Sequence, residues 1–188
     1  MTKIHGLSFI LIVFLFGLLY QSQNAFSQRL QLRRDMLFGD VEFSTVHKGR
    51  IRLTPSGALK LTNSPSGLVL TGTGQSGRVR VRERTGVIEI RCSNTATLAD
   101  SSGNTIPISE VRVSFPTAKG WGNALTRVCN GVGGAAVDIY DLTADPANNL
   151  NIYVGGKINV NGSAIQSSDT YSTANAGGVA VTIDVVFQ

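Results

Sequence analysis

The sequence predicts an all-β fold in a single domain, a β-sandwich or barrel of short strands. After residue 28, apolar side chains recur at every second position in several short segments, and helix-favouring residues are nowhere grouped at a period of 3.6. Turn-forming residues separate these runs, and the chain holds 21 glycines but only 7% aromatic residues. This regular spacing predicts roughly nine to eleven strands.

The N-terminus predicts a signal peptide over residues 1–27, with residues 28–188 forming the β-sandwich domain. Lys3 gives a basic start, Gly6 to Tyr20 is an apolar run, and Ala25-Phe26-Ser27 supplies the small residues of a cleavage site before Gln28. The alternative is a membrane anchor, but a spanning helix needs about 20 apolar residues, more than this run contains. We therefore expect an exported bacterial protein, with no transmembrane span after cleavage.

Turn residues between alternating segments predict several hairpins. Pro55-Ser56-Gly57 is one such turn, because proline presets φ and glycine permits positive φ. The predicted hairpins join residues 50–53 to 58–62, residues 78–82 to 87–91, and residues 96–98 to 106–108. Further strands are predicted at residues 41–43, 68–70, 111–115 (stopped by Pro116), 135–142, 150–154 and 157–160. The segment from Lys119 to Asn130 has no predicted structure.

The last stretch, Gly177 to Gln188, alternates most clearly. Its odd positions are β-branched or aromatic, and they are Val179, Val181, Ile183, Val185 and Phe187. Its even positions are small or polar, except Val186. Because a strand has a period of two, each set lies on one face. The sequence predicts a closing strand whose odd face enters a core or serves assembly with another chain.

The two cysteines, Cys92 and Cys129, are predicted to form one disulfide, because export exposes both thiols to an oxidising compartment. The bond would close a loop of about 38 residues, worth roughly 4 kcal/mol in the chain-entropy model. A metal site or a reactive thiol is the alternative, which the lack of a nearby histidine disfavours.

The residues offer little for catalysis, so we predict no enzyme, no catalytic residue, no cofactor and no metal. After the signal the one histidine is His47, and nothing beside it completes a site. Asp138, Asp141 and Asp145 could hold a cation, but oxygen-ligand loops usually space their acids more closely. Residues 72–77 match G-x-G-x-x-G, yet a strand pattern follows instead of the helix that a nucleotide site requires.

Arg78, Arg80 and Arg82 form a basic stripe, since alternation places them on one strand face and Val79 and Val81 on the other. One interpretation is a surface for an anionic partner, such as a polysaccharide, a lipid headgroup or a nucleic acid. The other is a solvated outer face that also resists edge pairing. Nucleic acid is the weakest partner, because no interleaved aromatic residues are present for base stacking.

Several motifs resemble the domain-of-unknown-function family 4402 of exported bacterial proteins. They are Leu37-Phe38-Gly39, Gly49 to Leu53, Val154 to Val160, Tyr171, and Val181 to Phe187. Phe187 stands where a tyrosine is more usual in that family. The ending also resembles subunits of the chaperone–usher route, which implies an immunoglobulin-like or pilin-like sandwich. In those subunits the closing strand is held by a periplasmic chaperone and the missing strand comes from the next subunit's N-terminal tail.

The resemblance implies a non-enzymatic pilin-like surface or structural protein, fimbrial or adhesive, whose partners are a chaperone and like subunits. The alternative is a stand-alone periplasmic or secreted binding domain that uses the basic stripe for an anionic surface polymer. The N-terminal tail, Gln28 to Met36, discriminates between them. A polymerising subunit needs this tail free and strand-like, whereas a binding domain folds it into its own sheet.

Overall fold

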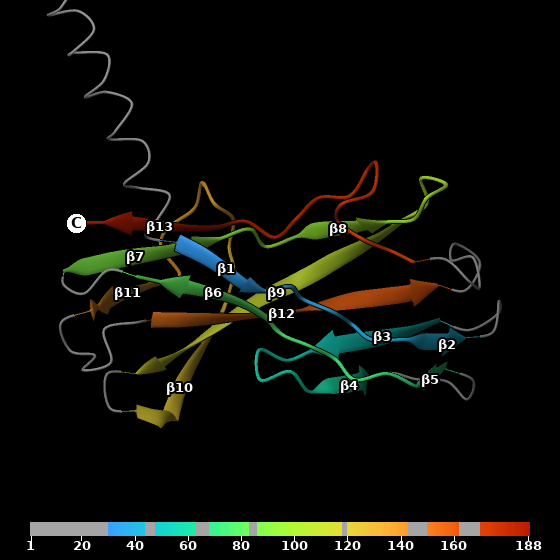
Figure 1. Cartoon of the computed structure of the whole chain (residues 1–188), viewed down its shortest axis with the longest axis horizontal. Helices are drawn as coiled ribbons and strands as arrows, with labels where there is room; N and C mark the ends of the chain where they lie inside the picture. Colours follow the sequence, from blue (N-terminus) through green and yellow to red (C-terminus); the bar gives the residue numbers. More distant parts are fainter. Residues whose placement is uncertain are drawn as a thin grey trace, which may run out of the picture.

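The computed structural model describes residues 30–43, 48–62, 68–82, 86–117, 120–142, 150–161 and 170–188. Almost all of their regular structure is β-strand (Figure 1). The strands are β1 (Leu30–Arg34), β2 (Val41–Phe43), β3 (Lys48–Leu53), β4 (Leu59–Thr62), β5 (Leu68–Leu70), β6 (Gly77–Val81), β7 (Val87–Cys92), β8 (Ala96–Ala99), β9 (Thr105–Thr117), β10 (Gly120–Val128), β11 (Asp138–Asp141), β12 (Leu150–Asn161) and β13 (Ile183–Phe187). Within these ranges no helix is long and apolar enough to cross a membrane.

The strands pair in antiparallel fashion in two main sheets. The large sheet runs β1-β6-β12-β3-β4, and β9 joins it by pairing with β12, β8 and β10. The small sheet runs β11-β7-β13, and β2 and β5 pair as a separate ribbon. Figure 1 shows β12 passing through the middle of the large sheet and β13 at the upper border of the molecule.

The core lies between these sheets because the alternating strands turn their apolar faces toward each other. Ile88 and Ile90 of β7 and Ile152 of β12 are completely buried. The rings of Phe115 in β9 and Tyr140 in β11 meet edge to face, with centroids 6.0 Å apart, across the two sheets. The all-β sandwich predicted from the sequence is thus confirmed, whereas its immunoglobulin-like or pilin-like subtype remains a prediction.

A single long strand, β12, organises the large sheet. Its first half pairs with β6 and its second half with β3 along the same edge, while β9 pairs with its other edge. Gly155 lies where β6 gives way to β3, and a Cβ there would meet the Leu53 carbonyl oxygen at 2.2 Å. Only glycine fits such a close backbone approach. The two predicted segments at residues 150–154 and 157–160 are therefore one strand.

Two of the three predicted hairpins are present. β3 pairs with β4 around Gly57, whose φ is +91°, and β8 pairs with β9. The hairpin between residues 78–82 and 87–91 is wrong: β6 pairs with β1 and β12, whereas β7 pairs with β11 and β13. The chain instead crosses from the large sheet to the small sheet here, and Val81 of β6 joins Ile88 and Ile90 of β7 in one buried core.

The structure also corrects some strand boundaries. β9 does not stop before Pro116 but runs from Thr105 to Thr117, with Pro107 and Pro116 near its ends. These prolines lie outside the central part of β9 that pairs with β12, so their missing N–H groups cost no bond to that strand. β10 occupies most of the segment without predicted structure, and β11 is shorter than the strand predicted at residues 135–142.

Candidate functional site

The outer face of the large sheet is built around the outward-facing residues of β12. Ile152, Val154 and Ile158 point into the core and are at most 5% exposed. Because side chains alternate along a strand, the odd-numbered residues of β12 point to the opposite, outer face. The outward residues are Asn151, Tyr153, Gly155, Lys157 and Asn159. Apart from the glycine, each of them carries a polar group.

The strand register places an arginine beside each of these five positions. One of the five, Lys157, is itself a cation. Paired residues in an antiparallel sheet project to the same side. The pairs are Arg80 with Asn151, Arg78 with Tyr153, Arg112 with Gly155, Arg52 with Lys157, and Arg50 with Asn159. We call these six cationic side chains the basic face: Arg50, Arg52, Arg78, Arg80, Arg112 and Lys157.

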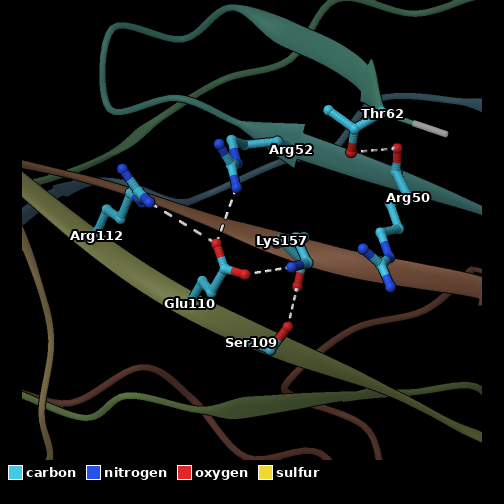
Figure 2. A network of polar contacts seen from close by, with 7 residues as sticks. All are labelled: Arg50, Arg52, Thr62, Ser109, Glu110, Arg112 and Lys157. Carbon is cyan, nitrogen blue, oxygen red and sulfur yellow. Dashed lines mark hydrogen bonds and ion pairs between the residues drawn. The ribbon is translucent and has the colours of Figure 1, made fainter.

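One carboxylate, that of Glu110, lies within the basic face. Figure 2 shows it between Arg52 of β3, Arg112 of β9 and Lys157 of β12. Its Oε2 atom lies 2.9 Å from Arg52 Nη2 and 3.8 Å from Arg112 Nη2, and its Oε1 atom accepts a hydrogen bond from Lys157 Nζ. The carboxylate thus joins three strands of the sheet.

A β-bulge positions Glu110. Between the pair of Gly155 with Arg112 and the pair of Lys157 with Ser109, β9 contains one more residue than β12. Glu110 has φ +49°, the sole positive φ among non-glycine residues in the described ranges. A non-glycine residue in this region costs of order 1–3 kcal/mol. Such bulges re-aim a side chain, here into the group of cations.

The surroundings of Glu110 favour its ionised form. The hydrogen bond from Lys157 lowers the pKa of Glu110 most, and the charges of Lys157, Arg52 and Arg112 lower it further, although desolvation opposes them. The Glu110 side chain is 37% exposed and that of Lys157 only 14%. Glu110 is therefore a carboxylate at neutral pH and offsets part of the positive charge at this end of the basic face.

The opposite end, at β1 and β6, carries the predicted stripe of Arg78, Arg80 and Arg82. Val81 is completely buried, so the arginines beside it in sequence point outward. No carboxylate of the described residues lies within ion-pair distance of them. Desolvation and the like charges of Arg80, Arg82 and Arg78 together lower the pKa of Arg33 on β1. Positive charge at this end is thus concentrated rather than neutralised.

The sequence alone located only two of the six cations of this face, Arg78 and Arg80. Arg50 and Arg52 alternate with Ile51 in the same way as the predicted stripe, and that signal was available. Nothing local reveals that β3 and β6 lie end to end along β12, because this placement depends on long-range pairing. Glu110 could not be found either, since its position depends on a bulge in β9.

The closing strand lies at the edge of the small sheet, where β13 pairs only with β7 in the part of the chain described. Val185 is buried, and the neighbouring odd positions Val181, Ile183 and Phe187 pack half-buried against the core. Val179 departs from the predicted pattern: it is 56% exposed and precedes β13. It forms only an isolated bridge with Thr97, which aligns the chain with β8 but does not place its side chain under the other sheet.

The predicted disulfide is present. Cys92 at the end of β7 and Cys129 after β10 are bonded, with Cα atoms 5.2 Å apart and both residues buried. The bond links the small sheet to the β9–β10 part of the large sheet. It holds the two layers together beside the core but lies away from the basic face.

The described part of the N-terminal tail, from Leu30 onward, is folded into the domain. Residues Leu30 to Arg34 form β1 and pair with β6. Arg34 fixes the end of this strand, because its Nε and Nη2 atoms donate hydrogen bonds of 2.8 Å to the carbonyl and hydroxyl oxygens of Ser76.

The remaining candidates do not form a site. Asp138 pairs with Arg127 at 3.0 Å, while Asp145 and His47 lie outside the described residues. Within the described ranges, no group of three or more histidine, cysteine or acidic residues is placed to hold a metal ion. Gly77 of the G-x-G-x-x-G segment begins strand β6, so no helix N-terminus follows the glycines. Comparisons with known protein families, curated proteins and solved structures find no match.

Proposed function

We propose that the protein is an exported, non-enzymatic β-sandwich domain that binds an anionic ligand through its basic face. The observation that carries this proposal is the alignment of cations from four strands on one side of one sheet, with a single carboxylate among them. A concentrated positive surface attracts and retains anions. The folded N-terminal tail supports a domain that acts alone.

The arrangement of the arginines also suits this role. Arginine presents a planar fork of donors that matches carboxylate, sulfate and phosphate groups. The Nε atoms of Arg52, Arg78, Arg80 and Arg112 are covered and have no hydrogen-bond partner among the described atoms. Because these Nε atoms are covered, the arginine side chains lie against the sheet before a ligand binds, which limits the rotamer entropy lost on binding.

Retention on an immobilised sulfated resin tests this function. The variant Arg78→Gln/Arg80→Gln should elute at clearly lower salt than the parent protein. The matched control, Arg91→Gln/Arg127→Gln, removes the same charge from residues whose ion pairs are with Glu89 and Asp138, away from the basic face. If both variants elute together, net charge alone explains retention and the proposed binding face is wrong.

A second candidate function is pilin-like assembly through the open edge of β13. Among the described residues only β7 pairs with β13, so the other side of that strand is a template for an added strand. Exposed apolar side chains occur near both sheet edges, with Leu32 of β1 70% exposed and Val186 of β13 37% exposed. The partner would be a periplasmic chaperone or a like subunit.

Light scattering on the purified mature protein, together with co-purification of a co-expressed periplasmic chaperone, tests assembly. Assembly predicts a stable complex that survives purification. A monomer at every concentration, in a genome without chaperone and usher genes beside this gene, would argue against it.

Export is part of both candidate functions. Signal cleavage before Gln28 predicts an intact mass for the exported protein that corresponds to residues 28–188. Retention of residues 1–27 in a membrane fraction would contradict it.

A further inference from the structure

The cations of the basic face follow one line, and this geometry extends the proposed function on which the inference rests. Along β12, the outward positions from Asn151 to Asn159 each have a cationic neighbour. Successive outward positions on a strand are about 6–7 Å apart, so the row spans about 26 Å. A single small anion would contact only one or two of these side chains.

We propose that the ligand is a linear acidic polysaccharide that lies along β12 and contacts the basic face from Arg80 at one end to Arg50 at the other. Arg50, Arg78 and Arg80 then meet carboxylate or sulfate groups of the polymer, whereas at Arg52, Arg112 and Lys157 the polymer competes with Glu110. The outward residues of β12 form the floor beneath it. The exposed amide of Asn159 and the phenol of Tyr153 suit the hydroxyl groups of sugars, whereas the Oδ1 atom of Asn151 is covered.

The side chains beneath the row favour a polysaccharide over a single-stranded nucleic acid. Proteins that bind single strands combine a basic groove with several aromatic residues on which successive bases stack. Among the outward residues of β12 only Tyr153 is aromatic, and its cross-strand neighbours are Arg78 and Ser114. One ring can support one sugar ring, but it cannot stack a run of bases.

Ligand length distinguishes a linear polymer from a small anion. Titration of the purified parent protein with a heparin dodecasaccharide, a heparin disaccharide and inorganic sulfate should give tight binding to the first alone. If the disaccharide or sulfate binds as well as the dodecasaccharide, the face is an anion site and the linear ligand is wrong, although the proposed function stands. If none of the three binds, both proposals fall.

Variants at the two ends test whether one ligand contacts the whole row. Arg80→Gln and Arg50→Gln should each weaken binding of the dodecasaccharide by about tenfold, the loss expected for a charged hydrogen bond. Arg91→Gln, on the outer face of the small sheet, should leave binding unchanged. If Arg50→Gln has no effect while Arg80→Gln does, the ligand does not extend along β12. Equal affinity for a single-stranded DNA of similar charge would overturn the polysaccharide assignment.

Discussion

Val185 and Val186 allow a matched test of the closing strand, because two identical neighbours face opposite sides. Val185 is 7% exposed and lies opposite Ile90, which is completely buried, whereas Val186 is 37% exposed. Val185→Asn loses about 1.5–3 kcal/mol of apolar burial and leaves an amide without partners, at about 1–3 kcal/mol more. We therefore expect the free energy of unfolding to fall by about 2.5–6 kcal/mol, a large part of the total for a domain of this size.

Val186→Asn is the control for strand propensity, since asparagine disfavours strands in either position. It should cost less than about 1 kcal/mol, because surface substitutions rarely cost more. Urea denaturation of both variants, followed by circular dichroism, measures the difference in the free energy of unfolding. Equal losses would show that β13 does not turn its odd face into the core and would refute the reasoning from the two-residue period.

Three further predictions concern the disulfide and the basic face. Cys92→Ser/Cys129→Ser should lower the free energy of unfolding by about 4 kcal/mol in denaturant titrations, and an unchanged midpoint would argue against a stabilising bond. The folded-state pKa of Glu110 is lowered. The stability that its carboxylate contributes is therefore present above the unfolded-state pKa and is lost as pH falls through the folded-state pKa. Glu110→Gln should thus be less stable than the parent at neutral pH, and the thermal midpoints of the two proteins should converge in acid. At low salt Arg80→Gln should raise the melting temperature, whereas Arg52→Gln should lower it. Both shifts should become smaller in 1 M salt. Shifts of the same sign for the two variants would contradict the charge distribution described above.

Local patterns in the sequence were sufficient to predict the fold class and the features that are determined by residues close together in the chain. The turn at Gly57 and the alternation from Val181 through β13 to Phe187 required only residue type and spacing. Cys92 and Cys129 could be paired because the chain has no other cysteines. Each of these features arises from a short stretch of chain or from a count.

Features that depend on which sheet a strand joins could not be predicted from local sequence patterns. Arg84-Thr85-Gly86 is compatible with a hairpin and with a crossover, and the choice depends on where β6 and β7 find partners. Val179 follows the same alternation as Val185, yet it lies before β13 begins and remains exposed. Glu110 reaches the basic face because of a β-bulge in β9, and no local sequence pattern predicts that bulge.

The two ends of the basic face differ in how their charge is balanced, and this sets where an anionic ligand gains most. Unit charges about 7 Å apart in water repel by roughly 0.6 kcal/mol, and 0.1 M salt screens such neighbours only partly. Near Lys157 the carboxylate of Glu110 already offsets this repulsion. Near Arg78 and Arg80 no described carboxylate does so; the pKa of Arg33 is lowered there, first by desolvation and then by the charges of Arg80, Arg82 and Arg78. An incoming anion therefore relieves repulsion at the β1–β6 end but competes with a resident carboxylate at the other. Binding should depend more on Arg80 than on Arg52, even though both belong to one row.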